Sequence, residues 1–370
     1  MSLSGQLPIT KVTVGALREL SSSLSELELV GMEKFSDDVF AGPLGQLPLL
    51  TKLVLRGSST VGPKTAQASL PCLLLGSWRT HLETLKVAGI PNWTDSTFAK
   101  FITKLSATER PVYQHLSALK FRQTQLTEAS LNPFLAFFPN LKRLDISFTG
   151  VLHIPQSIPS QLEKLSVKST KVHLHELLPM LSFMSGLKTL SLGALGTGQG
   201  ATTAMGNSSA LTMTDKDLGS LTAALAMMPQ LESVDLVQNS KLGKTDRQRE
   251  SLRAFVSTVG RRCKYLNLGG IVSLDSSVLS GLLSDGDKPN SPLETLVLSN
   301  TAVDDEAATY IASCPALSTL DLSGTKFTRD GVIRVIDGCS RLEKLDLTSC
   351  RGVPVQERRR FFEVWKEEQT

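Results

Sequence analysis

The chain has 370 residues, of which 41% are hydrophobic and 20% charged, and its formal net charge is +4. This length and composition can bury a large core, and the small net charge does not by itself require nucleic acid or an anionic membrane as a partner. The five cysteines are scattered without CxxC spacing, so the sequence indicates neither a disulfide framework nor a zinc site.

The sequence shows no signal for secretion or membrane insertion. Its first residues lack the charged start and apolar core of a signal peptide. No run approaches the roughly 18 apolar residues of a membrane span. We therefore expect an intracellular protein, cytoplasmic or nuclear, with no membrane partner.

A phrase with the pattern LxxLxL recurs along the chain. A weak copy, ITKVTVGA at Ile9, leads us to assign residues 1–23 to an N-terminal cap or a degenerate first repeat. Twelve clear copies follow at spacings of 21 to 34 residues, with one of 44. They begin at Leu24, Leu50, Leu82, Leu116, Leu141, Leu162, Leu187, Leu231, Cys263, Leu293, Leu317 and Leu342.

Each copy predicts a short strand followed by a helix. Side chains two residues apart on a strand point to the same side, so the last two leucines of the phrase face inward and the residue between them faces outward. Apolar residues at three-to-four spacing in 304–316 and 329–341 predict helices after two of the strands. One such unit cannot bury its apolar side alone, so the copies must stack on one another.

The predicted fold class is an α/β solenoid of about 12 repeats over residues 24–353. We expect a curved horseshoe, with a parallel β-sheet on the concave face and helices on the convex face. The alternative is a doubly wound sheet or an α/β barrel, whose strands are buried on both faces and appear as continuous Val/Ile/Leu runs. The polar residues interleaved in KRLDIS and EKLSVK favour the solenoid.

With twelve such copies, nearly the whole chain resembles the leucine-rich-repeat superfamily. Residues 314–350 are similar to the cysteine-containing subtype of F-box leucine-rich-repeat proteins. The matching residues are Cys314 and Cys339 before their leucines, Cys350 after the last strand, and the Asp330-Gly331 pair at a helix start. In other copies the position after the strand is Thr124, Thr149, Thr170, Thr301, Thr325 or Asn239.

This resemblance implies a shape like that of a substrate receptor. An F-box would need more helical sequence than the 23 residues that precede Leu24, so we expect no F-box here. The uneven spacing also differs from the regular repeats of ribonuclease-inhibitor and Ran GTPase-activating proteins.

Two segments depart from the repeat. Residues 193–213 are rich in Gly, Ala, Thr and Ser and carry no charge, which predicts a flexible loop with a binding role as one option. Residues 354–370 predict a C-terminal capping helix, whose aromatic residues cover the last coil. The alternative for this tail is a docking peptide or a localisation signal at RRRFF.

The third, fifth and seventh positions of each copy are predicted to face outward. The first copy places Glu26 and Glu28 there, and from the seventh copy onward the positions are mostly small or acidic. Copies two to six carry a single acid, Asp145, against eight bases. These bases are Lys52, Arg56, Lys86, Lys120, Arg122, Arg143, Lys164 and Lys168.

The eight bases predict a partner-binding face for an acidic or phosphorylated protein segment, because Lys and Arg pair with carboxylate and phosphate. The alternative is that they only keep the outer side of the strands soluble. Single-stranded nucleic-acid binders add aromatic stacking residues, and the outward positions hold only Tyr265. The sequence thus argues against nucleic acid.

No catalytic motif is present, so we expect no enzyme activity, cofactor or metal site. His173 and His175 lack a third ligand, and Cys314 and Cys339 are expected to pack in adjacent coils. Two functions remain: an interaction scaffold, in a role like that of a substrate adaptor, and a regulator of an enzyme such as a small GTPase, similar to Ran GTPase-activating proteins. The partner and the oligomeric state stay open.

Overall fold

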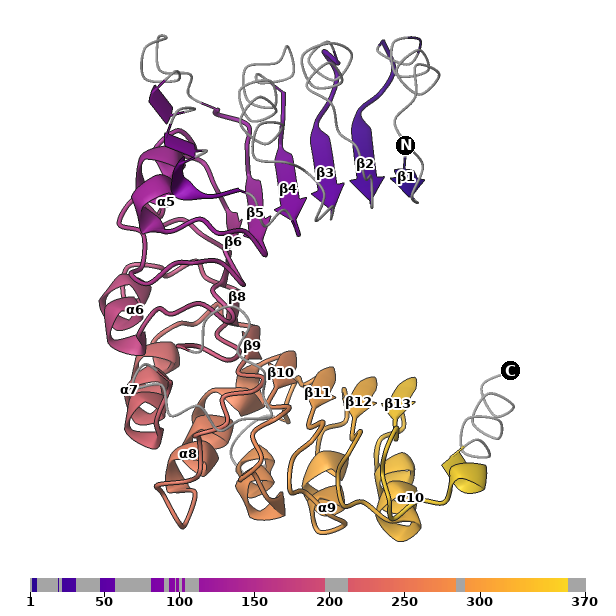
Figure 1. Cartoon of the computed structure of the whole chain (residues 1–370). Coiled ribbons are helices and arrows are strands. Elements are labelled where there is room, and N and C mark those ends of the chain that lie inside the picture. The colour runs from indigo at the N-terminus through magenta and orange to yellow at the C-terminus, as the bar shows by residue number, and fades with distance from the viewer. Residues whose placement is uncertain are drawn as a thin grey trace. The chain divides into compact units, whose positions relative to one another are not determined.

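The computed structural model describes most of the chain in two compact units. Within the described residues the first unit ends at Leu187 and the second begins at Lys188 (Figure 1). The described residues are 2–4, 19, 22–30, 47–56, 81–89, 93–96, 98–99, 102–103, 113–196, 212–283 and 290–358.

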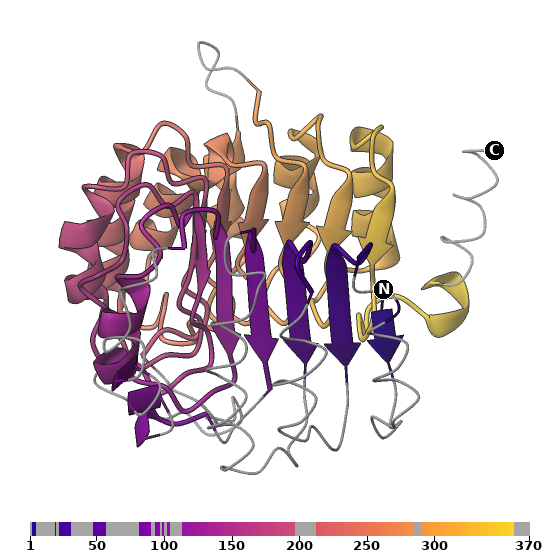
Figure 2. The same cartoon turned by 90° about the horizontal axis from the view of Figure 1, so that it is seen from above.

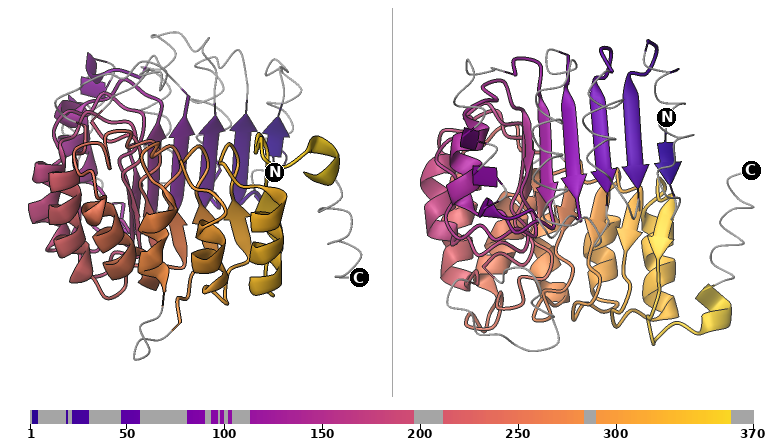
Figure 3. Two further views of the ribbon diagram at one scale, coloured as in Figure 1. Left: turned by 90° about the horizontal axis from the view of Figure 1, so that it is seen from below. Right: turned by 45° about the horizontal axis from the view of Figure 1, so that its top comes forward.

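Unit 1 is a parallel sheet in which each strand pairs with the next strand along the chain (Figure 2). Its strands are β1 Ser2–Ser4, β2 Glu26–Val30, β3 Lys52–Arg56, β4 Thr84–Ala88, β5 Ala118–Arg122, β6 Arg143–Asp145 and β7 Lys164–Ser166. Two helices of this unit are α5 Glu128–Leu135 and α6 Leu174–Leu181. Figure 3 shows β1 to β5 side by side from two other directions.

Unit 2 repeats the same plan with shorter strands. These are β8 Thr189–Ser191, β9 Ser233–Asp235, β10 Tyr265–Asn267, β11 Thr295–Val297, β12 Thr319–Asp321 and β13 Lys344–Asp346. The helical segments are α7 Asp215–Ala226, α8 Glu250–Thr258, η3 Gly260–Arg262, η4 Ser276–Leu282, α9 Ala307–Ala312 and α10 Arg329–Gly338. In Figure 1 these helices lie along one side of the strands of their unit.

Two columns of apolar side chains form the core of each unit. The register places the fourth residue of every copy beside the fourth residue of the next, as Leu53 beside Leu85 in unit 1 and Leu266 beside Leu296 in unit 2. All of these side chains are buried. Full burial of a leucine side chain contributes about 2 kcal/mol, so the stacked columns account for the stability of such short strands.

The polar residue that follows a strand donates a hydrogen bond to a backbone carbonyl of its own coil. Thr149 Oγ1 donates to the Ile146 carbonyl three residues earlier at 2.7 Å, and Thr325 Oγ1 does the same to Leu322 at 2.6 Å. Asn239 also bridges two coils, because its Nδ2 donates to the Leu192 carbonyl at 3.0 Å. A buried carbonyl without a donor is costly, which explains the small polar residues at this position.

The predicted leucine-rich-repeat fold is confirmed. All twelve copies contain a strand, and the helices expected in 304–316 and 329–341 are α9 and α10. Strand β1 was not predicted, and it pairs with β2 ahead of the first clear copy. No helix of the described residues is long and apolar enough to cross a membrane.

Three predicted features lie partly or wholly outside the described residues. The weak copy at Ile9 lies outside them, and so do residues 197–211 of the 193–213 loop. Of the predicted helix 354–370, residues 355–358 are helical and 359–370 are not described.

Candidate protein-binding face

The outward positions of unit 1 carry the eight predicted bases. Seven of them lie on strands β3 to β7, and Lys168 follows β7 by two residues. None of the eight is buried. The structure therefore brings these bases to one face of the sheet of unit 1, the face that points away from the buried leucines, as the repeat pattern predicts. We call this the outer face.

Bases face one another across neighbouring strands at two places. Lys86 of β4 is the register partner of Lys120 of β5, and Arg143 of β6 is the partner of Lys164 of β7. Adjacent strands lie about 4.8 Å apart, and like charges directly opposite each other destabilise a sheet. The sheet thus carries two pairs of like charges that do not stabilise the fold.

Other bases of the face are paired within the protein. Lys52 Nζ lies 2.7 Å from Glu26 Oε2, and Arg56 Nε lies 3.4 Å from Glu28 Oε1. Both acids belong to β2, the strand before the two bases. The positive charge of β3 is therefore largely balanced by β2.

Asp145 balances a third base. Its Oδ2 lies 3.7 Å from Arg122 Nε, and the Arg122 guanidinium also sits 5.3 Å above the Phe148 ring. Asp145 is only 7% exposed, and its Oδ1 accepts a hydrogen bond from the Ser147 backbone N–H at 3.1 Å. Asp145, the only acid at the outward positions of copies two to six, thus already interacts with the Ser147 backbone and with Arg122.

Of the five other bases, Lys168 also has an interaction within the chain. The other four have no ion pair among the described residues, and we call them the basic cluster. They are Lys86, Lys120, Arg143 and Lys164. Burial lowers the pKa of Lys120, Asp145 opposes this effect, and the neighbouring bases lower the pKa further. Asp145, the register partner of Lys120 on β6, therefore compensates part of this charge, although it forms no ion pair with Lys120 among the described residues.

The outward positions of unit 2 differ from the sequence-based expectation. Ser191, Asp235 and Asn267 are 7%, 4% and 8% exposed, so the prediction of an open acidic or small lining is wrong for these three residues. Asp235 and Asn267 each accept a hydrogen bond at 3.0 Å from the backbone N–H two residues later. Asp321 and Asp346 do the same at 2.8 Å. Asp and Asn side chains commonly accept hydrogen bonds from nearby backbone N–H groups. These contacts account for the acidic residues at the outward positions of unit 2 without requiring a bound ligand.

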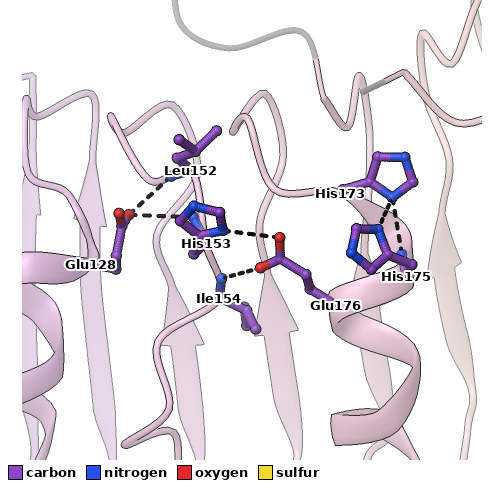
Figure 4. Close-up of polar contacts among 7 residues, drawn as sticks. All are labelled: Glu128, Leu152, His153, Ile154, His173, His175 and Glu176. Atoms are coloured by element: carbon purple, nitrogen blue, oxygen red, sulfur yellow. Dashed lines mark hydrogen bonds and ion pairs between the residues drawn. The ribbon is translucent and has the colours of Figure 1, made fainter. Parts of the chain in front are cut away.

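Three of the five histidines lie at the start of α6 and on the loop before β7. His173 is the N-cap of α6 and accepts the His175 backbone N–H, and the two Nδ1 atoms are 2.5 Å apart. Figure 4 shows His153 held by Glu176, with Glu128 accepting the His153 backbone N–H. Within the described ranges, no group of three or more His, Cys, Asp or Glu side chains is placed to hold a metal ion.

The fold and its repeated polar positions define the chain as a leucine-rich-repeat solenoid, a fold built by stacking short repeats. No family model matches the chain. It is similar to Putative F-box/LRR-repeat protein 23 of Arabidopsis thaliana, at 38% identity over 58 residues. This match covers 16% of the chain and 13% of that protein.

Solved structures show likeness over much more of the chain. The crystal structure of the Rad7 and Elc1 complex in yeast matches with a TM-score of 0.59 and 17% identity, over 93% of this chain and 85% of that chain. A leucine-rich-repeat protein of Leptospira interrogans matches with a TM-score of 0.44 and 16% identity, over 97% of this chain and 98% of that chain. At such identities the likeness concerns the fold alone.

Proposed function

We propose that this protein is a non-catalytic scaffold that binds an acidic or phosphorylated segment of a partner protein on the outer face of unit 1. The observation that carries the proposal is the basic cluster, in which Lys86 faces Lys120 and Arg143 faces Lys164. The contact residues are the cluster together with Lys52, Arg56, Arg122 and Lys168.

Electrostatics favours an anionic ligand at the cluster. Two unit charges about 4 Å apart interact by roughly 1 kcal/mol in bulk water and by more near a protein surface. A carboxylate or phosphate placed between Lys86 and Lys120 replaces a repulsion with two attractions. Charge-assisted contacts of this kind are stronger than neutral hydrogen bonds.

The geometry favours an extended segment as the ligand. The four bases lie on β4 to β7, so one ligand must cross four strands to contact all of them. With strands about 4.8 Å apart, three strand spacings amount to about 14 Å. An extended peptide covers this length with four or five residues, at about 3.3 Å per residue.

An adaptor-like role is supported by the relatives. The matched Arabidopsis protein is named as an F-box/LRR-repeat protein, and Rad7 was solved in complex with Elc1. We propose that this chain likewise links a captured segment to further protein. The alternative, a regulator of an enzyme such as a small GTPase, stays a prediction.

The proposal is tested with a fluorescent Glu-rich peptide, its phosphoserine version and a Lys-rich peptide of equal length, using fluorescence anisotropy. In the variant Lys120→Gln/Lys164→Gln we expect affinity for the two acidic peptides to fall by about tenfold or more, since two charge-assisted contacts are lost. The Lys-rich peptide should not bind either protein.

The matched control is Lys142→Gln/Lys171→Gln. Both residues are exposed lysines of unit 1 outside the third, fifth and seventh positions. This control removes the same charge and should leave affinity nearly unchanged. Equal losses in the two double variants would mean that net charge, rather than the face, attracts the peptide, and no loss in either would exclude the face.

A further inference from the structure

Unit 2 contains a cavity of about 520 Å³ beyond the C-terminal ends of β11 to β13. We call it the strand-end cavity. Its exposed polar lining consists of Asn300, Lys326, Ser349 and Arg351, each from a turn that follows a strand. Thr325 also lines it, but this side chain is buried and donates to the Leu322 carbonyl. It belongs to unit 2 alone and shares no residue with the face of unit 1.

The side chains of this lining are free to meet a ligand. All four are exposed, and none has a side-chain hydrogen bond or ion pair with any part of the chain that the structure describes. Some other cations of unit 2 are engaged, as Lys264 is with Glu232 at 3.0 Å and Arg249 with Asp275 at 2.7 Å. Lys326 and Arg351 therefore present charge that no described acid balances.

A second cavity of unit 2, at the other end of the same strands, does not share the excess of basic residues in its lining. It has about 510 Å³ and lies at the N-terminal ends of the same strands. Arg341 lines it together with Glu294 and Glu343, so its acids outnumber its base. The strand-end cavity has two bases and no acid in its lining.

Two glycines, Gly324 and Gly352, line the strand-end cavity. Gly324 has a φ of +69°, and a Cβ there would lie 2.5 Å from Asn300 Oδ1. A Cβ on Gly352 would lie 2.5 Å from the Phe327 carbonyl oxygen. A larger residue at 324 would be strained by its backbone conformation, and one at 352 would require the backbone at Phe327 to move, so both positions of the lining favour glycine.

We propose that the strand-end cavity binds a phosphoryl group. Such a group has three terminal oxygens and a charge of about −1.5 to −2 at neutral pH. Arg351 offers a planar fork of donors and Lys326 a point charge, while Ser349 and Asn300 add a hydroxyl and an amide. A carboxylate has two oxygens and one charge, so it leaves part of this donor set unused.

The volume also leaves room for what the phosphoryl group is attached to. Ligand pockets range over about 300–1,000 Å³, and the cavity lies in this range. Two sources fit this chemistry: a small phosphate ester or a phosphorylated side chain of a protein. Both require the same contacts with Arg351 and Lys326.

The test is isothermal titration calorimetry with inorganic phosphate, a phosphoserine peptide and the same peptide without phosphate. The titrations use the Lys120→Gln/Lys164→Gln variant, in which the face of unit 1 is weakened. A result for the strand-end cavity is therefore independent of whether the face of unit 1 binds acidic peptides. We expect phosphate-dependent binding that weakens about tenfold in Arg351→Gln and in Lys326→Gln.

The matched control is Arg341→Gln, which removes one arginine from the other cavity and should not change the affinity. If the phosphopeptide binds much more tightly than both inorganic phosphate and the plain peptide, a phosphorylated side chain is the source. If inorganic phosphate binds as well as the phosphopeptide, a small phosphate ester is the source. Binding that is absent, or that is insensitive to Arg351 and Lys326, would overturn the proposal.

Discussion

Lys52 Nζ lies 2.7 Å from Glu26 Oε2, so the first base of the predicted face already has an acidic partner on the preceding strand. The hydrogen bond and charge of Lys52 lower the pKa of Glu26. Glu28 likewise forms an ion pair with Arg56, with Arg56 Nε 3.4 Å from Glu28 Oε1. Strand β2 therefore limits the unpaired positive charge to β4 through β7.

Removing these acids should strengthen the binding of acidic peptides. In Glu26→Gln/Glu28→Gln, Lys52 and Arg56 become available, and we expect a gain in affinity of about two- to fivefold at low salt that shrinks as salt is added. Fluorescence anisotropy at two ionic strengths measures it. The control Glu83→Gln removes an exposed acid outside the outward positions, and an equal gain there would contradict the prediction.

Asp215 joins two coils of unit 2 and should be essential for stability. It is 4% exposed and begins α7. Its carboxylate accepts the Gly243 N–H at 2.6 Å, the Asp246 N–H at 2.9 Å, and both the N–H and the hydroxyl of Thr245. Asp215→Ala leaves the buried Gly243 N–H and the less buried donors of Thr245 and Asp246 without this acceptor, and we expect a loss of about 3 kcal/mol in the free energy of unfolding.

Urea unfolding followed by circular dichroism checks this value. Asp215→Asn keeps one acceptor oxygen and should show a smaller loss than Asp215→Ala. The exposed Asp337 of α10 is the control, because Asp337→Ala should stay within about 0.5 kcal/mol of the parent. Equal stability of the alanine variants at 215 and 337 would refute the role of the bridge.

The strands were predictable because the LxxLxL pattern indicates both which side chains are buried and where each strand lies in its copy. Leu144 and Leu165 must face the same core, and this fixes the register that aligns Arg143 with Lys164. The same alignment predicts that Glu26 faces Lys52, since both occupy the third position of their copies. The ion pair could therefore have been inferred from the sequence, although the eight bases taken together suggest one uniform face.

Other features could not be read from the repeat. Asp235 occupies an outward position, yet it is only 4% exposed, and it accepts a backbone N–H in the turn that follows. Asp215 meets residues 28 to 31 positions away, and the coil length varies too much to predict such a partner. The strand-end cavity depends on three turns of different sequence, so no motif marks it.

His153 should titrate above its usual range. A hydrogen bond and the charge of Glu176 raise the pKa of His153, and the Nδ1 to Oε1 distance is 3.0 Å. Because the folded-state pKa is raised, the contribution of this pair is fully present below the unfolded-state pKa of 6.5 and is lost as the pH rises through the folded-state value.

A titration of the imidazole signals by NMR tests this prediction. We expect the pKa of His153 to lie above 6.5 in the parent and to fall in Glu176→Gln. The stability difference between the parent and His153→Gln should likewise be largest at acidic pH and vanish at alkaline pH. A pKa that does not respond to Glu176→Gln would show that the pair does not form in solution.

Three buried cysteines should resist alkylation in the folded protein. Burial raises the pKa of Cys263 to about 12, of Cys314 to about 11 and of Cys339 to about 12. The thiolate is the reactive form, so almost none is present at mildly alkaline pH. Iodoacetamide labelling followed by mass spectrometry should leave these three unmodified in the folded protein and label them in urea, where a free thiol has a pKa of about 8.5. Rapid labelling of any of them in the folded protein would contradict the packing role that their place in the repeat predicts.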